Sequence, residues 1–146
     1  GHFVKSFAYT GPTQGARVQT GASDGAKIYS ARDFTFDHLP NELSGADWIQ
    51  VPQADSLYSA ADLMQLAIRR NAIIYIAHDN RLAAPDWLKN QFKAVPNQIV
   101  IIDGHAMQLF RRVAKNGGSI TLGSNSEEGS AKEANAYIVF VTGASN

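Results

Sequence analysis

The residues with the clearest chemical potential stand together at the end of an apolar run. Residues 73–77 read Ile-Ile-Tyr-Ile-Ala and are followed directly by His78, Asp79, Asn80 and Arg81. Asp79 and Arg81 are two positions apart, so on a continuing strand their side chains lie on the same face. At the rim of a cleft they could bind sugar hydroxyls or a uronate carboxylate. The alternative, which we favour, is an internal ion pair that fixes the end of the strand.

Catalysis by this cluster is not indicated. His78 and Asp79 are adjacent, so their side chains on a strand point to opposite faces, which is poor geometry for a His–Asp relay. The sequence has no Gly-x-Ser-x-Gly motif, and His38, His78 and His105 lack the spacing of metal ligands. With 13 acidic residues, possible carboxylate pairs carry no signal for glycoside hydrolysis. We therefore predict that the chain is not itself an enzyme and holds no catalytic metal.

Aromatic rings are further candidates for sugar contact, because a pyranose presents C–H bonds to the face of a ring. Trp48 begins a short extended segment and is expected to be the more open of the two tryptophans. Tyr9, Tyr29 and Tyr58 lie in loop-adjacent segments, so we expect exposed rings there. Trp87 falls in a predicted helical turn, and its ring is expected to cover the core.

Paired arginines offer a way to bind acidic groups. Arg69 and Arg70 lie at a predicted hairpin tip, and Arg111 and Arg112 lie in one strand. We choose Arg112 as the outward-facing arginine that joins Arg81 in binding uronate or sulfate groups. A solvated sheet face with cross-strand ion pairs explains the same residues equally well.

The polar segment 123–136 is predicted to be a mobile loop. Its residues Asn125, Glu127 and Glu128 carry the hard oxygen atoms that calcium prefers, although they form no EF-hand pattern. We expect no cofactor, and structural calcium stays open as an alternative to a solvated loop.

Short strands separated by turns must position these residues. Residues 64–68 and 72–79 read as an antiparallel hairpin around Arg70-Asn71, with the second strand buried on both faces. Residues 84–92 form the clearest helical turn. Further strands are expected around the turns at 103–104 and 117–118, and at 17–36, 47–52 and 137–141. Eight to ten strands predict an all-β fold, an antiparallel β-sandwich of the jelly-roll type with one or two short helical turns.

Composition restricts the class of protein. A length of 146 residues suits one domain. The 13 basic and 13 acidic residues give a net charge of zero, whereas nucleic-acid-binding domains are usually basic. Cysteine is absent, which excludes disulfides, and no segment approaches the roughly 18 apolar residues of a membrane span. We expect residues 1–146 to form a single module excised from a larger multidomain protein, without nucleic-acid or membrane partners.

Seven short motifs follow one another in an informative order. They are Ala-Arg-Asp-Phe-Thr-Phe at 31–36, Gly-Ala-Asp-Trp-Ile-Gln at 45–50, Ile-Tyr-Ile-Ala-His-Asp-Asn-Arg at 74–81, Pro-Asp-Trp-Leu at 85–88, Leu-Phe-Arg-Arg at 109–112, Gly-Gly-Ser-Ile-Thr-Leu-Gly-Ser-Asn at 117–125 and Tyr-Ile-Val-Phe-Val at 137–141. Over residues 28–141 this order resembles accessory β-sandwich modules of secreted bacterial polysaccharide-degrading enzymes. His78, Asn80 and Phe110 depart from that pattern, where an aromatic residue, Asp or Ser, and Tyr are more usual.

The resemblance implies a galactose-binding-like or similar jelly-roll domain that binds carbohydrate or positions a catalytic neighbour. Our first hypothesis is a noncatalytic carbohydrate-binding module, secreted or periplasmic, that captures a polysaccharide for a catalytic domain of the same chain. An acidic, uronic-acid-containing glycan is preferred. Loops at one end of the sandwich would bind it through Arg81, Arg112 and exposed aromatic rings. The alternatives are a spacer or docking module that binds no sugar, and a small enzyme using His78 or Tyr75.

Overall fold

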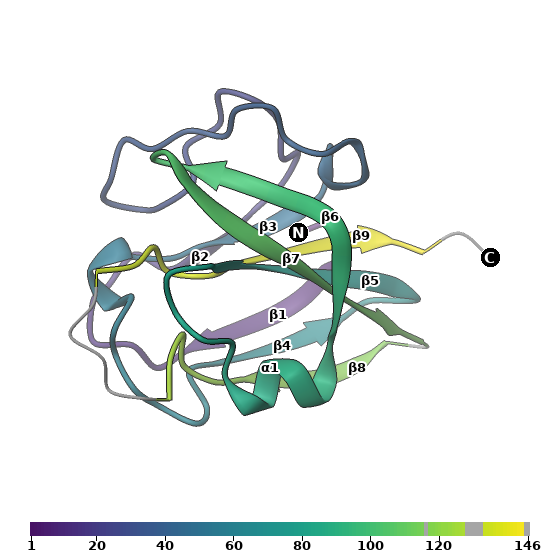
Figure 1. Ribbon diagram of the computed structural model, residues 1–146. Coiled ribbons are helices and arrows are strands. Elements are labelled where there is room, and N and C mark those ends of the chain that lie inside the picture. The colour runs from purple at the N-terminus through teal and green to yellow at the C-terminus, as the bar shows by residue number, and fades with distance from the viewer. Residues whose placement is uncertain (116, 128–132, 145–146) are drawn as a thin grey trace.

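Two antiparallel β-sheets form the protein, whose computed structural model describes residues 1–115, 117–127 and 133–144 (Figure 1). The smaller sheet has the order β1-β4-β8 and the larger sheet the order β2-β3-β9-β5-β7-β6. The strands are β1 (Val4–Tyr9), β2 (Arg17–Gln19), β3 (Asp47–Gln50), β4 (Met64–Ile68), β5 (Ala72–Asp79), β6 (Lys93–Ile102), β7 (His105–Ala114), β8 (Gly118–Leu122) and β9 (Ile138–Gly143). Short helical segments are η1 (Asn41–Leu43), η2 (Gln53–Asp55) and α1 (Asp86–Gln91). The predicted all-β antiparallel sandwich is confirmed.

The core extends to both faces of the larger sheet. Strand β5 lies between β7 and β9, and all its residues except Ile73 are buried. Phe140 of β9 pairs with Trp48 of β3, and the ring of Phe36 lies 5.6 Å from Phe140 and 5.4 Å from Trp48. The segment before β3 therefore covers the sheet face on which these two aromatic side chains lie. This double burial matches the continuous apolar sequence of β5.

The predicted hairpin of residues 64–68 and 72–79 is wrong, although both strands exist. Strand β4 pairs with β1 and β8, whereas β5 pairs with β7 and β9 in the other sheet. The short connection therefore crosses from one layer to the other. Strands β7 and β9 occupy both edges of β5, so β4 cannot pair with it. In β4, the predicted alternation is present, and Met64, Leu66 and Ile68 are buried. Periodicity identified the strands but contained no information about their partners.

Strands β6 and β7 form the hairpin predicted around Asp103-Gly104. Both turn residues have positive φ angles, 50° and 75°, which the Asp-Gly sequence favours in a two-residue turn. Further from the turn, Ala94 pairs with Phe110 and Ile99 with Gln108, so β6 advances five positions where β7 advances two. This bulge bends β6 sharply across the front of the molecule (Figure 1).

The bulge is held in place by one side chain. The Gln108 amide donates hydrogen bonds to the carbonyl oxygens of Val95 and Gln98, at 2.9 and 3.3 Å. Pro96 lacks an N–H, and Asn97 has a positive φ of 61°, so neither continues the regular ladder. The result is an edge strand with a fixed kink.

The segment between β8 and β9 differs from the predicted solvated loop at both of its described ends. Ser124, Asn125 and Asn135 are buried. The Trp87 indole donates a hydrogen bond to the Ser124 carbonyl oxygen at 2.8 Å, and the Tyr137 hydroxyl donates one to the Gly123 carbonyl oxygen at 2.8 Å. These polar residues are therefore structural.

Two smaller details complete the fold. The second run of the 17–36 segment forms only an isolated bridge between Lys27 and Thr35, where a strand was expected. Helix α1 spans Asp86–Gln91 within the helical turn predicted over residues 84–92, and Pro85 before it is in extended conformation. Within the described ranges, no helix has the length and apolarity needed to cross a membrane.

Candidate functional site

Asp79 and Arg81 form the internal ion pair that the sequence favoured. The fully buried Asp79 carboxylate accepts hydrogen bonds from Arg81 Nη2 at 2.7 Å and from Arg81 Nε at 3.1 and 3.2 Å. It also accepts the backbone N–H groups of Arg81 at 2.9 Å and of Asn135 at 2.8 Å. Both carboxylate oxygens are thus occupied by the protein. The prediction that Asp79 contacts a ligand is wrong, because its carboxylate has no free surface.

The surroundings of Asp79 and Arg81 shift the pKa values of both side chains. Burial by itself raises the pKa of the Asp79 carboxyl, but hydrogen bonds from the Arg81 side chain, the Asn135 N–H and the Arg81 N–H outweigh it, so the pKa lies below its ordinary value. The Asp79 hydrogen bond also raises the pKa of Arg81. Both groups are therefore held in their charged forms.

His78 lies on the other face of the strand and is also internal. Its Nε2–H donates a hydrogen bond of 2.7 Å to the Asn125 carbonyl oxygen, since a carbonyl can only accept. Burial lowers the pKa of the imidazole, so it is held neutral. This hydrogen bond connects β5 to the segment after β8, so the role of His78 is structural.

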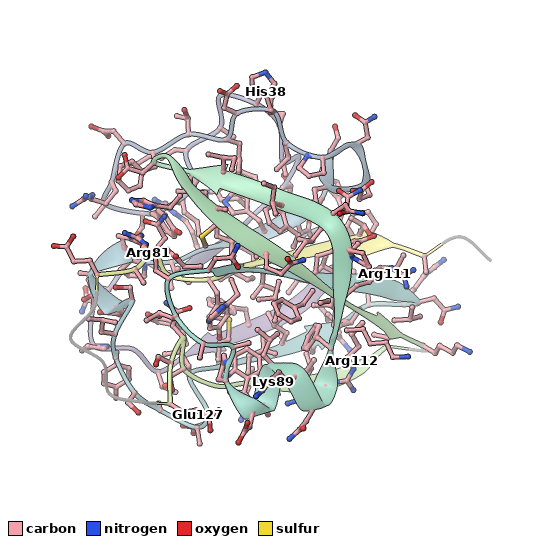
Figure 2. The ribbon with its side chains drawn as sticks, in the orientation of Figure 1. His38, Arg81, Lys89, Arg111, Arg112 and Glu127 are labelled. Carbon is pink, nitrogen blue, oxygen red and sulfur yellow. The ribbon has the colours of Figure 1, made fainter. Side chains whose placement is uncertain are left out.

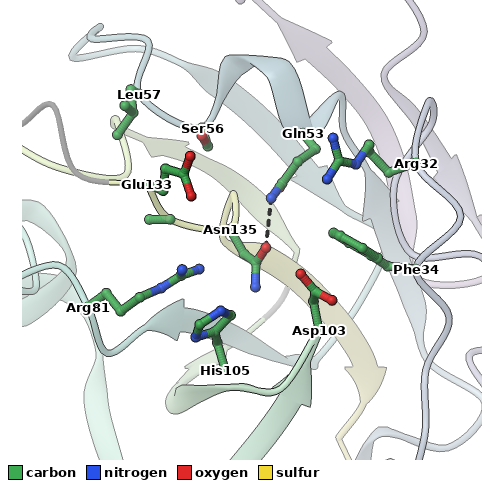
Figure 3. Close-up of a pocket in the computed structure, with 11 residues that line it drawn as sticks. Arg32, Phe34, Gln53, Ser56, Leu57, Arg81, Asp103, His105, Glu133 and Asn135 are labelled. Carbon is green, nitrogen blue, oxygen red and sulfur yellow. Dashed lines mark hydrogen bonds between the residues drawn. The ribbon is translucent and has the colours of Figure 1, made fainter.

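A cleft of about 280 Å³ opens beside Arg81 and is called the loop-end cleft (Figure 3). It lies where the end of β5, the β6–β7 turn, η2 and the segment before β9 come together. Its lining residues are Arg32, Phe34, Gln53, Ser56, Leu57, Arg81, Asp103, His105, Glu133, Ala134 and Asn135.

The loop-end cleft has polar walls around a fixed floor. Arg32 and Arg81 approach it from opposite sides (Figure 3), and the Arg81 side chain is 32% exposed despite its pair with Asp79. On the floor, the Gln53 amide donates a hydrogen bond of 2.7 Å to Asn135 Oδ1. The Arg32 guanidinium lies 5.0 Å from the centre of the Phe34 ring. This arrangement offers hydrogen-bond donors and one aromatic ring to a polar ligand.

Sequence reasoning identified only one of the charged residues in this cleft. Arg32, Phe34, Asp103 and His105 were missed as site residues, and the Phe34 side chain is only partly buried. Arg32 and Phe34 belong to the Ala-Arg-Asp-Phe-Thr-Phe motif at 31–36, which carried part of the family resemblance. The Asp-Gly turn also placed Asp103 at a strand end. Neither the motif at 31–36 nor the Asp103-Gly104 turn predicts that these two segments lie beside the same cleft.

Two of the aromatic predictions are wrong. The ring of Tyr29 is completely buried, and its hydroxyl donates a hydrogen bond of 2.6 Å to the Ala136 carbonyl oxygen. Trp48 is buried as well, and its indole N–H donates to the Ile28 carbonyl oxygen at 3.2 Å. Tyr29 lies in the segment between β2 and β3 and Trp48 lies in β3, and both side chains are buried, so neither ring is accessible. Tyr58 is 39% exposed and follows Leu57, which lines the loop-end cleft.

Arg112 does not join Arg81. Figure 2 shows Arg81 and Arg112 well apart, with Arg112 near Arg111 and helix α1. Arg112 instead lines a second depression of about 460 Å³, called the basic groove. The basic groove is lined by Gln91, Lys93, Ala94, Val95, Pro96, Arg111, Arg112 and Val113. The expectation of one site containing both Arg81 and Arg112 is therefore wrong.

Two of the residues considered for calcium form hydrogen bonds within the protein, although Asn125 Oδ1 itself has no hydrogen-bond partner among the described residues. The Asn125 amide donates hydrogen bonds to the carbonyl oxygens of Ser56 and Asn135, at 3.2 and 2.9 Å. Glu127 accepts the backbone N–H of Asp86 at the start of α1. Glu128 lies outside the described residues. In residues 1–115, 117–127 and 133–144, no three His, Cys, Asp or Glu side chains are grouped as they would be around a metal ion.

Comparison with known proteins places the chain beside part of a glycoside hydrolase. No family model matches it. A β-glucuronidase from Formosa agariphila is 28% identical over 137 residues, which cover 94% of this chain and 14% of that protein. The structure of a β-glucuronidase from glycoside hydrolase family 2 superimposes with a TM-score of 0.88 and 30% identity, again over 94% of this chain and 14% of the other.

A second solved structure shows a likeness of fold alone. It is a family 138 glycoside hydrolase that targets pectin rhamnogalacturonan II, with a TM-score of 0.60 and 16% identity over 95% of this chain and 17% of that one. The chain thus spans about one-seventh of the length of the β-glucuronidases that it matches. The resemblance to an accessory β-sandwich module of a polysaccharide-degrading enzyme is confirmed.

Proposed function

We propose that this chain is a noncatalytic carbohydrate-binding module that captures a polysaccharide for an attached catalytic domain. The observation that carries the proposal is the loop-end cleft, where two guanidinium groups and an aromatic ring face one polar space. The similarity to a small part of a β-glucuronidase supports an accessory role beside a glycoside hydrolase. Secretion or a periplasmic location belongs to the same proposal, since a polysaccharide is met outside the cytoplasm.

Each side chain of the loop-end cleft has a distinct task in this proposal. Arg32 is exposed and free to bond sugar hydroxyls or a carboxylate, whereas Arg81 presents the part of its guanidinium that Asp79 leaves free. The Phe34 ring offers a surface to the C–H bonds of a pyranose. An acidic glycan is the preferred ligand, because guanidinium groups bind carboxylates in a bidentate manner.

The test is affinity electrophoresis through gels that contain polygalacturonate or a neutral galactan, at low and high salt. We expect retardation of the wild-type protein and a clear loss of retardation by Arg32→Ala. Arg70→Ala is the matched control, because Arg70 is exposed, carries the same charge and lines neither the loop-end cleft nor the basic groove. Equal effects of the two substitutions would contradict a site in the cleft.

A docking module that binds no sugar is the second candidate. It is favoured by three exposed aliphatic side chains on the β6–β7 hairpin: Ile99, Ile101 and Val113 are 44%, 45% and 43% exposed. Such side chains suit contact with another protein surface. Absence of retardation by a broad panel of polysaccharides would favour this candidate over glycan binding.

A further inference from the structure

The basic groove lies where the bulge in β6 turns this edge strand. The kink at Val95 and Pro96 forms one wall, and Arg111, Arg112 and Val113 of β7 form the other. The Gln108 amide holds the kink, so the shape of the groove is built into the hairpin. Bulges are frequent at sheet edges and beside functional sites, where they redirect side chains.

The charge in the basic groove is one-sided. Lys93, Arg111 and Arg112 line it, and its lining includes no acidic residue, in a chain whose formal net charge is zero. Lys93 lies directly opposite Arg111 in the pairing of β6 with β7. Like charges at opposite positions of a strand pair are destabilising. In the described part of the chain, no carboxylate forms an ion pair with any of the three.

One of the three cations is held in position. Arg112 Nη1 donates a hydrogen bond of 2.9 Å to Gln91 Oε1 at the end of α1, which orients the guanidinium and leaves its other N–H groups available. Arg111 and Lys93 are exposed. The groove therefore combines one oriented donor with two adjustable cations.

The loop-end cleft has a different charge balance. Its arginines, Arg32 and Arg81, are offset by Asp103 and Glu133. The basic groove therefore offers a polyanion a second cluster of cations, and no acidic residue in its lining offsets them. We propose that the basic groove is a second glycan site, which binds the carboxylate or sulfate groups of an acidic polysaccharide. This inference rests on the proposed function in taking a glycan as the ligand, but the two sites share no residue.

The apolar residues of the groove favour a glycan over an acidic protein segment. Val95, Pro96 and Val113 lie among the three cations and suit the C–H faces of sugar rings between successive anionic groups. Ile99 and Ile101, the most exposed large aliphatic side chains of the described residues, do not line the groove. Of the three exposed aliphatic side chains on this hairpin, only Val113 lines the groove, so most of the apolar surface that could anchor a protein partner lies outside this site.

The experiment measures retardation in gels containing polygalacturonate, dextran sulfate or unmodified dextran, and in parallel gels containing poly-L-glutamate. The test protein is Lys93→Ala/Arg111→Ala, which spares the hydrogen-bonded Arg112. The control is Lys5→Ala/Arg70→Ala. It also removes one lysine and one arginine, but from exposed positions outside both sites. Circular dichroism is used to check that both variants are folded before their binding is compared.

We expect the test protein to bind the acidic glycan about tenfold more weakly or worse than wild type, since a charged hydrogen bond contributes about 1.5–3 kcal/mol and 1.4 kcal/mol is a factor of ten. The control should retain nearly all binding. Retardation by polygalacturonate alone would identify carboxylates as the ligand groups, and retardation by dextran sulfate alone would identify sulfates. Equal losses in test and control, no loss in the test protein, or preferential retardation by poly-L-glutamate would each overturn the assignment.

The two proposals can fail separately. Loss of acidic-glycan binding in the double variant with no effect of Arg32→Ala would retain the basic groove and reject the loop-end cleft. The reverse result would retain the cleft and reject the groove.

Discussion

Replacing Arg81 with alanine should destabilise the fold by leaving a buried carboxylate without its cation. Removing one partner of a buried ion pair typically costs about 3–5 kcal/mol. Here Arg81 is one-third exposed, and Asp79 keeps the N–H groups of Arg81 and Asn135 as donors. We therefore expect a loss of about 2 kcal/mol, which lowers the melting temperature of a domain of this size by about 4–8 °C.

The pH dependence of this loss is the sharper part of the prediction. In wild type the pKa of Asp79 lies below its ordinary value of 3.8, so its stabilising contribution is present above that pH and is lost as the pH falls through the folded pKa. Without the guanidinium, the pKa of Asp79 rises from its wild-type value because its strongest lowering influence is removed, and protonation then relieves the unpaired charge at a higher pH. The stability difference between wild type and Arg81→Ala should thus shrink as the pH falls.

Urea unfolding followed by tryptophan fluorescence at about pH 7 and about pH 4.5 measures this difference. The lowered pKa of His78 also weakens the fold in acid, but it acts on both proteins and cancels in the comparison. Arg70→Ala, with an exposed side chain, should remain within about 0.5 kcal/mol of wild type. A deficit that stays constant between the two pH values would refute the role assigned to the Asp79 charge.

Three further substitutions test other parts of the structure by urea unfolding. Asp47→Asn should cost about 1–3 kcal/mol, because the Asp47 carboxylate accepts the backbone N–H groups of residues 2–4 at 3.1, 2.7 and 2.9 Å; a cost below about 0.5 kcal/mol would show that this anchor is dispensable. Gly123→Ala would place a Cβ 2.7 Å from Trp87 Cδ1, so we expect a loss of about 1–3 kcal/mol and a changed near-ultraviolet circular dichroism spectrum, whereas an unchanged spectrum would contradict the close contact. Tyr29→Phe removes a buried hydroxyl donor and should cost about 1 kcal/mol, a result that an exposed ring would not give.

Local patterns in the sequence were sufficient for much of the fold. Alternation in Met64, Leu66 and Ile68, and the Asp103-Gly104 turn between two apolar runs, predicted elements that the structure contains. The information lies in neighbouring residues, so a single sequence reveals it. The partners of β4 and β5 were not predictable in this way, because two strands joined by a short turn can pair with each other or pass into different sheets.

The site was predicted less well because it is assembled from distant segments. The Asp79–Arg81 pair was found because its members are two residues apart. Tyr29 and Trp48 were misassigned because their cover comes from residues far along the chain, such as Ala136, which accepts the Tyr29 hydroxyl. Residue type and position near a predicted loop do not show that distant residues bury the Tyr29 and Trp48 rings.

Asn135 links the core to the proposed glycan-binding surface. Its backbone N–H binds Asp79, its amide donates to the Ile102 carbonyl oxygen at 3.1 Å, and its Oδ1 accepts from Gln53. One buried residue therefore joins the ends of β5 and β6 to η2 on the floor of the loop-end cleft. A floor fixed by the folded state need not be ordered again on binding, which lowers the entropic cost of capturing a flexible polymer. If the proposed function holds, the buried hydrogen bonds of Asp79 and Asn135 support the floor of the loop-end cleft, whereas Arg32→Ala tests ligand contact directly.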